Sequence, residues 1–162
     1  MATPLTEHFT LEELIRSDVA IRMGIDNTPT AQHKRHLTLL CQHILEPVRV
    51  HFDKPVRVNS GYRCLALNMV INPLTTTVDR LSKHCLGQAA DIEIDGISNY
   101  DLAVWIRDHI PAFNQVILEF YTPGQPNSGW VHVSYVHQSN KKECLTATRK
   151  DGKLVYFPSF LQ

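Results

Sequence analysis

The chain has 162 residues, 43% of them hydrophobic, and its 16 basic residues balance its 16 acidic ones. This length suffices for one domain with a core and is short for two, so we expect a single domain over residues 1–162 and a monomer. The scattered lysines and arginines lack the clustered charge of nucleic-acid-binding proteins, and no apolar run approaches the roughly 20 residues that span a bilayer, which excludes both of those classes.

The first third of the chain is predicted to be helical. Thr10 and Glu13 form a capping box, so a short helix is expected from about Leu11 to Met23. A second, long helix is expected from Pro29 to about Phe52, because apolar residues recur there mainly at three- and four-residue intervals. Pro47 should bend this helix or end its regular part.

The remaining predicted elements are short. In chain order they are a strand, a helical stretch, a loop, a strand, a helix, two strands and a hairpin, at residues 55–59, 62–70, 71–81, 90–95, 98–109, 115–120, 130–136 and 145–157. The hairpin turns at Asp151-Gly152, a pair that favours tight turns. Because the helices do not alternate strictly with the strands, the predicted fold is α+β, with N-terminal helices packed on a mainly antiparallel sheet.

Three of the predicted strands carry polar residues on one face. Successive side chains of a strand point to opposite faces, so Asp91, Glu119 and His132 share a face if their strands share a sheet. His84 lies on the loop that enters the first of these strands, where Gly87 permits a tight backbone approach. Taken singly, such residues are more often surface histidines, strand caps or ion-pair partners.

Together, these residues have the chemistry of a metal site. Two imidazoles and one carboxylate are a ligand set that holds catalytic zinc and leaves a fourth position for water. Such a zinc ion lowers the pKa of water and polarises a carbonyl, the two tasks of amide hydrolysis. The pattern therefore predicts one Zn²⁺ at His84, Asp91 and His132, with Glu119 as the general base.

The strings SGYRC, SKHCLGQAADIEI and WVHVSY follow one another along the chain. They resemble the zinc peptidases related to bacterial D-alanyl-D-alanine carboxypeptidases, in particular their small phage-encoded, peptidoglycan-cleaving members. The family pattern SxHxxGxAxD with a later histidine is matched by Ser82, His84, Gly87, Ala89, Asp91 and His132. HFTLEEL, GIDNTP and ILEPVR also resemble that subgroup, so the resemblance covers most of the chain. It implies a hedgehog/D-Ala-D-Ala-peptidase-like fold.

The resemblance also assigns roles to single residues. It implies that the zinc ligands are His84, Asp91 and His132. Arg63 of SGYRC would orient a substrate carboxylate or carbonyl oxygen and stabilise the oxyanion. Ser82 is expected to hydrogen-bond near the metal. Trp130, on the same strand face as His132, is expected to wall the substrate groove, with core packing as the alternative.

One position departs from the family pattern. Many relatives carry the catalytic acid three residues before the last zinc histidine, and that position here is Gly129. The role must then fall to another carboxylate. Glu119, on the strand predicted to lie beside that of His132, is preferred to Glu93. This assignment is an inference from the strand pattern and matches no motif.

The function implied by the resemblance is that of a phage endolysin, which cuts an amide bond in the stem peptide or cross-link of bacterial peptidoglycan. The N-terminus has no signal-peptide pattern, so the protein is expected to stay in the host cytoplasm until its release to the periplasm or cell wall, unless it is carried on the virion. One alternative is a D-alanyl-D-alanine carboxypeptidase, in which Arg63 would grip the free carboxylate. The other is a non-catalytic, metal-bearing cell-wall-binding or tail structural domain, which the missing acid at Gly129 favours.

Overall fold

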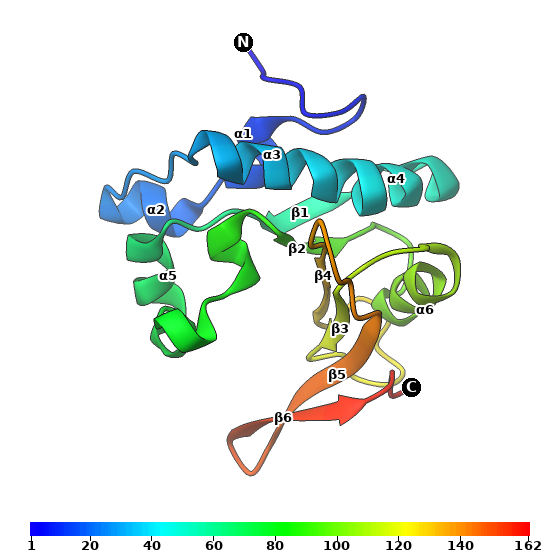
Figure 1. The fold of residues 1–162 in the computed structure, drawn as a ribbon. Helices are drawn as coiled ribbons and strands as arrows, with labels where there is room; N and C mark the ends of the chain where they lie inside the picture. The colour runs from blue at the N-terminus through cyan, green and yellow to red at the C-terminus, as the bar shows by residue number, and fades with distance from the viewer.

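The fold is organised around a six-stranded sheet in the order β1-β2-β4-β3-β5-β6 (Figure 1). The computed structural model describes residues 1–162. The strands are β1 (Arg57–Ser60), β2 (Ala89–Glu93), β3 (Gln115–Glu119), β4 (Trp130–Ser134), β5 (Glu143–Lys150) and β6 (Lys153–Pro158). Neighbouring strands are antiparallel except β3 and β5, which run parallel. The predicted α+β fold with a mainly antiparallel sheet is confirmed.

Six α-helices accompany the sheet. They are α1 (Leu11–Ile15), α2 (Asp18–Met23), α3 (Ala31–Leu40), α4 (Glu46–Phe52), α5 (Leu65–Ile71) and α6 (Asn99–His109). A π-helical turn, η1 (Cys41–Leu45), joins α3 to α4, and three 3₁₀ turns follow α5: η2 (Pro73–Thr75), η3 (Val78–Arg80) and η4 (Lys83–Leu86). No helix is both long enough and apolar enough to cross a membrane.

The N-terminal helix differs from its prediction. The capping box of Thr10 and Glu13 is present, but the stretch from Leu11 to Met23 forms two helices rather than one. Arg16 has an extended backbone, and the Ser17 hydroxyl accepts a hydrogen bond from the Ala20 N–H at 3.2 Å. Because Ser17 caps a new helix, the chain changes direction there. The junction between α1 and α2 forms part of the wall of a cleft.

The long helix contains the irregularity that Pro47 predicts. In η1 the Glu46 N–H donates to the Cys41 carbonyl, five residues back, and α4 then starts with Pro47 as its second residue. Proline lacks an N–H and is tolerated at the start of a helix. The regular α-helix therefore ends at η1, a short distance before Pro47, and a second one begins.

The apolar face of the central strands packs against the helices. Its fully buried members are Ala90, Ile92, Val116, Leu118, Val131 and Val133. They belong to one cluster with residues of α3, η1 and α6, among them Leu37, Ile44 and Leu102. A slip of one residue in any of these strands would turn the apolar side chains away from the core, so burial fixes the register. The same register fixes which residues occupy the opposite face.

Candidate metal centre

Three side chains meet on the face of the sheet that lies opposite the core. Asp91 of β2 and His132 of β4 are direct partners in the antiparallel register, and His84 comes from η4, just before β2. The distance from His132 Nδ1 to Asp91 Oδ1 is 3.0 Å, and that from His84 Nε2 to the same oxygen is 3.4 Å. All three residues are buried, and one ligand atom from each lies within 4.8 Å of the others.

The residues present fit a zinc ion. Tetrahedral ligands at about 2 Å from zinc are about 3.3 Å apart, and the separations of 3.0 and 3.4 Å in this cluster are close to that spacing. Nitrogen and carboxylate oxygen are also donor types that zinc prefers. The predicted metal-binding group is therefore assembled by the fold.

The chain fixes the orientation of the His84 ring. His84 Nδ1 donates to the Gly61 carbonyl at 2.7 Å, which leaves Nε2 facing Asp91. The Ser82 hydroxyl accepts from the His84 N–H at 3.3 Å and so caps the turn that carries the ring. Gly87 closes this turn at φ +68°, and a Cβ there would lie 2.6 Å from the His33 carbonyl oxygen. The tight backbone approach predicted at Gly87 is confirmed.

The protonation states of the three cluster residues depend on one another. Burial alone would raise the pKa of Asp91, but the adjacent His84 and His132 outweigh it and hold the pKa of that carboxyl well below its usual range. Burial lowers the pKa of His84, against the attraction of Asp91. Burial also opposes protonation of His132, yet hydrogen bonding to Asp91 raises its pKa. Asp91 is thus a permanent anion that two imidazoles surround.

Glu119 stands at the edge of this cluster. In the β3–β4 register it is opposite Trp130, two residues along the strand from the partner of His132, and so on the same face. Its Oε1 lies 3.9 Å from His132 Nδ1, and its side chain is 22% exposed. Burial and the Asp91 carboxylate raise the pKa of Glu119 to about 7. A carboxyl with this pKa can both accept and return a proton near neutrality.

The backbone explains why Gly129 carries no acid. Gly129 has φ +64°, and a Cβ there would lie 1.9 Å from the carbonyl oxygen of Glu119 and 2.6 Å from the Phe120 carbonyl carbon. No L side chain fits at that contact. The chain therefore leaves position 129 bare, and the carboxylate closest to the cluster comes from the neighbouring strand.

Arg63 lies on the other side of the cluster. Its Nη2 is 3.5 Å from Asp91 Oδ2, its Nε donates to the Ser60 hydroxyl at 2.9 Å, and its Nη1 donates to Asn68 Oδ1 at 3.4 Å. Asn68 is fully buried and also donates to the Thr75 carbonyl at 3.1 Å. The sequence patterns did not reveal Asn68, because a lone asparagine within a helix gives no local signal of a partner.

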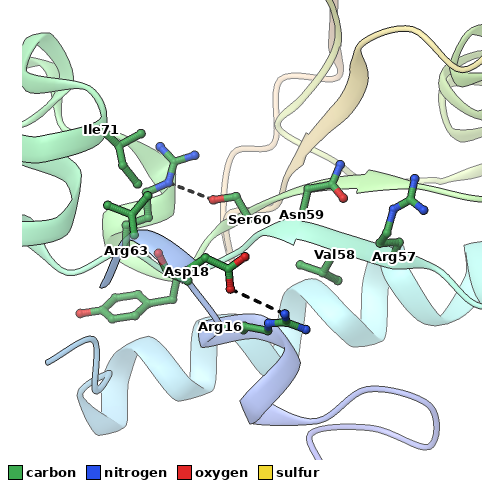
Figure 2. A pocket seen from close by; sticks show the side chains of 11 residues that line it. Arg16, Asp18, Arg57, Val58, Asn59, Ser60, Arg63 and Ile71 are labelled. Carbon is green, nitrogen blue, oxygen red and sulfur yellow. Dashed lines mark hydrogen bonds and ion pairs between the residues drawn. The ribbon is translucent and has the colours of Figure 1, made fainter. Parts of the chain in front are cut away.

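A cleft of about 570 Å³ adjoins Arg63 (Figure 2). Its lining comes from the α1–α2 junction, β1, the link between β1 and α5, and the end of α5: Arg16, Ser17, Asp18, Val19, Arg57, Val58, Asn59, Ser60, Tyr62, Arg63 and Ile71. The metal-binding trio does not line the cleft. Arg63 and Ser60 connect the two, because Ser60 is the register partner of Asp91. A molecule in the cleft would therefore reach the cluster past Arg63.

Trp130 and Ser82 are the two other residues that the sequence analysis assigns to the substrate site. Trp130 is partly buried, its ring centre is 5.3 Å from that of Phe120, and its buried Nε1 has no hydrogen-bond partner. It therefore lies on the Glu119 side of the cluster, away from the cleft. Ser82 contacts the backbone of His84. Substrate binding by either residue stays a prediction.

Comparison with known proteins agrees with this geometry. A family model described as Peptidase M15 matches residues 7–134, a stretch that holds the trio, Arg63 and Glu119 and ends where β4 ends. No curated protein was found to match the chain. M15 peptidases are zinc-dependent, in accord with the donor set of the cluster. The match covers most of the sequence and confirms the resemblance: the chain belongs to the Peptidase M15 family.

Proposed function

We propose that this protein is a zinc-dependent peptidoglycan peptidase of the phage endolysin type, which hydrolyses an amide bond in the stem peptide or cross-link. The observation that carries the proposal is the buried cluster of His84, Asp91 and His132 with Glu119 beside it. Membership of the Peptidase M15 family supports a zinc peptidase. The peptidoglycan bond as substrate and the phage origin go beyond family membership and belong to our proposal.

In this proposal the trio holds one zinc ion. The ion would supply a Lewis acid that polarises the scissile carbonyl and lowers the pKa of water. The chain contributes the donor atoms His84 Nε2, Asp91 Oδ1 and His132 Nδ1, and the Gly61 carbonyl keeps the first of these in place. Burial of all three keeps competing solvent away from the reacting groups.

Glu119 and Arg63 act from opposite sides of the trio. Glu119 takes a proton from the attacking water and delivers it to the leaving amine, a task that suits its pKa of about 7. Arg63 donates to the developing oxyanion, and its bonds to Ser60 and Asn68 hold the guanidinium in place before substrate arrives. The cleft beyond Arg63 receives part of the substrate.

A D-alanyl-D-alanine carboxypeptidase is the second candidate. Besides Arg63, the cleft is lined by Arg16 and Arg57, and guanidinium groups are suited to pair with a terminal carboxylate. Both additional arginines already have carboxylate partners: Arg16 pairs with Asp18, and Arg57 pairs with Asp95 and Glu93. Arg63 also pairs with Asp91, at 3.5 Å, and this contact places its guanidinium beside the metal-binding trio, so Arg63 would be the cation that recognises the chain end.

The Glu119→Gln variant tests the proposal. Purified sacculi are incubated with zinc-loaded protein, with and without a chelator, and the released fragments are identified by mass spectrometry. We expect a chelator-sensitive product from the natural chain, and a loss of roughly 10²–10⁴-fold in rate with Glu119→Gln at unchanged zinc content. Full activity in this variant would contradict the role of Glu119.

Glu93→Gln is the matched control. Glu93 lies on the same strand face as Asp91, but its carboxylate already accepts from Asn59 at 2.6 Å and pairs with Arg57 at 3.3 Å. Its rate should stay within about twofold of the natural chain, since a carboxylate engaged in this way is not free to exchange protons. The mass of the product separates an internal cut from loss of one terminal alanine. No product from folded, zinc-loaded protein on sacculi of differing chemistry would favour a non-catalytic binding or structural domain.

A further inference from the structure

The β5–β6 hairpin extends the metal-bearing face of the sheet beyond Glu119. Glu119 is the register partner of Ala147 in β5, and Ala147 is the partner of Tyr156 in β6. The three side chains therefore form one row on the same face. Two strand spacings of about 4.8 Å separate the backbones of Glu119 and Tyr156. Figure 1 shows the hairpin, in orange and red, projecting away from the N-terminal helices.

The middle member of this row is smaller and less exposed than its β6 neighbour. Ala147 carries only a methyl group and is buried, whereas Tyr156 is 54% exposed. Partial burial and the negative charge of Glu119 raise the pKa of Tyr156, in keeping with its place in this row. Leu154, two residues before Tyr156 and so on the same face, is also exposed. The hairpin thus presents an apolar, partly aromatic surface next to Glu119.

A free cation borders this surface. Arg149 is the register partner of Leu154 and shares its face. The Arg149 side chain is exposed, it donates to the Gly152 carbonyl at 3.4 Å, and its guanidinium lies 5.7 Å from the centre of the Phe120 ring. No carboxylate pairs with it. By contrast, Arg57 and Arg63, which line the cleft, both have carboxylate partners.

We propose that Arg149, Leu154 and Tyr156 form a second substrate subsite, which binds a carboxylate-bearing peptide segment on the Glu119 side of the scissile bond. The free guanidinium supplies the partner for the carboxylate, and the leucine and tyrosine side chains pack against the peptide. The subsite lies on the opposite side of the trio from the cleft at Arg63, so an extended substrate would cross the cluster. The inference rests on the proposed peptidase function.

The hairpin lies outside the part of the chain that matches the family model. The match to the family model ends at residue 134, and the hairpin begins at Glu143. The residues that hold the metal and move the proton thus lie within the matched region, and the proposed subsite lies outside it. The hairpin would therefore tune which peptide is bound, while the chemistry is left to the matched region.

The test is a binding measurement that does not require turnover. Zinc-loaded Glu119→Gln protein is titrated by calorimetry with a synthetic stem pentapeptide that has free carboxylates, and with the same peptide after amidation of those carboxylates. Adding Arg149→Gln should weaken binding of the free-carboxylate peptide about tenfold and leave the amidated peptide within about twofold. Adding Tyr156→Ala should weaken both peptides by a similar factor, because it removes packing rather than charge.

Two matched controls accompany these variants. Lys150→Gln removes the neighbouring cation, which faces the other side of β5, and Tyr100→Phe removes a phenol hydroxyl on α6, away from the sheet's metal-bearing face. Both should bind like the parent, and thermal unfolding checks that every variant is folded. Equal binding of both peptides by the parent and the Arg149→Gln variant would overturn the inference.

Hydrolysis by the natural chain is measured separately on the same pentapeptide. Cleavage together with unchanged binding in the Arg149 and Tyr156 variants would leave the proposed function standing and remove the subsite. Arginine-dependent binding without cleavage would contradict the peptidase function and overturn the assignment as a substrate subsite, leaving only a carboxylate-binding surface on the hairpin.

Discussion

The two faces of β2, β3 and β4 come from alternate residues of the same segments, yet they have opposite chemistry. Val131 and Val133 of β4 are fully buried against the helices, while His132 between them points to the metal-binding cluster. The core face gains stability from burial of apolar area. The other face buries an aspartate and two histidines, which costs free energy unless they pair with one another or with a metal. Stability and chemistry are therefore separated residue by residue.

The largest expected effect is on the metal-bearing face. Asp91→Ala removes the one anionic ligand, so we expect zinc content to fall from about one ion per chain to near zero and the hydrolysis rate to fall at least about a thousandfold. Metal analysis after dialysis and the sacculus assay measure both. Asp95→Asn is the control, because Asp95 is exposed and pairs only with Arg57. Full zinc occupancy in Asp91→Ala would show that the trio is not the metal site.

The next effect is on the core face. Leu118 is fully buried and precedes Glu119, and Leu118→Ala should lower the free energy of unfolding by about 2–5 kcal/mol through a cavity. Zinc content at low temperature should stay that of the natural chain, because Leu118 points away from the cluster. Urea denaturation measures the change, with Leu74→Ala, at an exposed position, as the control. A loss of zinc without a loss of stability would contradict the separation of the two faces.

The smallest effect lies far from both faces, where Glu46 of α4 holds the N-terminal segment. Its carboxylate accepts from the His8 N–H at 2.7 Å and contacts His8 Nδ1 at 2.9 Å. Burial would raise the pKa of Glu46, but the hydrogen bonds of this segment outweigh it and lower the pKa. The unfolded chain then takes up the proton first as the pH falls. The stabilisation is complete above the unfolded pKa of about 4.3 and is lost as the pH falls through the lower folded pKa.

Glu46→Gln should therefore reduce the free energy of unfolding by about 1 kcal/mol at pH 7, and the difference from the natural chain should shrink below about pH 4. Thermal unfolding at several pH values measures this difference. A difference that grows on acidification would show that Glu46 stabilises the segment in its protonated form.

The features that could be predicted from the sequence are those that depend on the alternation of side chains along a single strand. Strand periodicity placed Asp91, Glu119 and His132 on one face, and the observed register confirms that placement. It could not predict the partner of β5, because parallel pairing with β3 joins segments that are far apart in the chain and leaves no local pattern. For the same reason the row from Glu119 to Tyr156 appeared only in the structure.

Helix boundaries and supporting contacts show the same limit. Ser17 is a good helix cap, but the apolar spacing around it also fits one continuous helix, so the break at Arg16 was missed. The Gly61 carbonyl that orients His84 is a backbone atom and has no sequence signature at all. The ligand types were visible in the sequence, whereas the groups that hold them depend on the tertiary fold.

The contact between Gly129 and β3 also bears on how such proteins are recognised and redesigned. The start of β4 runs so close to the Glu119 carbonyl that an acid at position 129 and this path of the backbone exclude each other. A search that demands an acid three residues before the last histidine would discard this chain while its Glu119 carboxylate stands beside the cluster. Transplanting the acid onto β4 would first require a remodelled connection between β3 and β4, so the two placements are alternative solutions, each tied to its own loop.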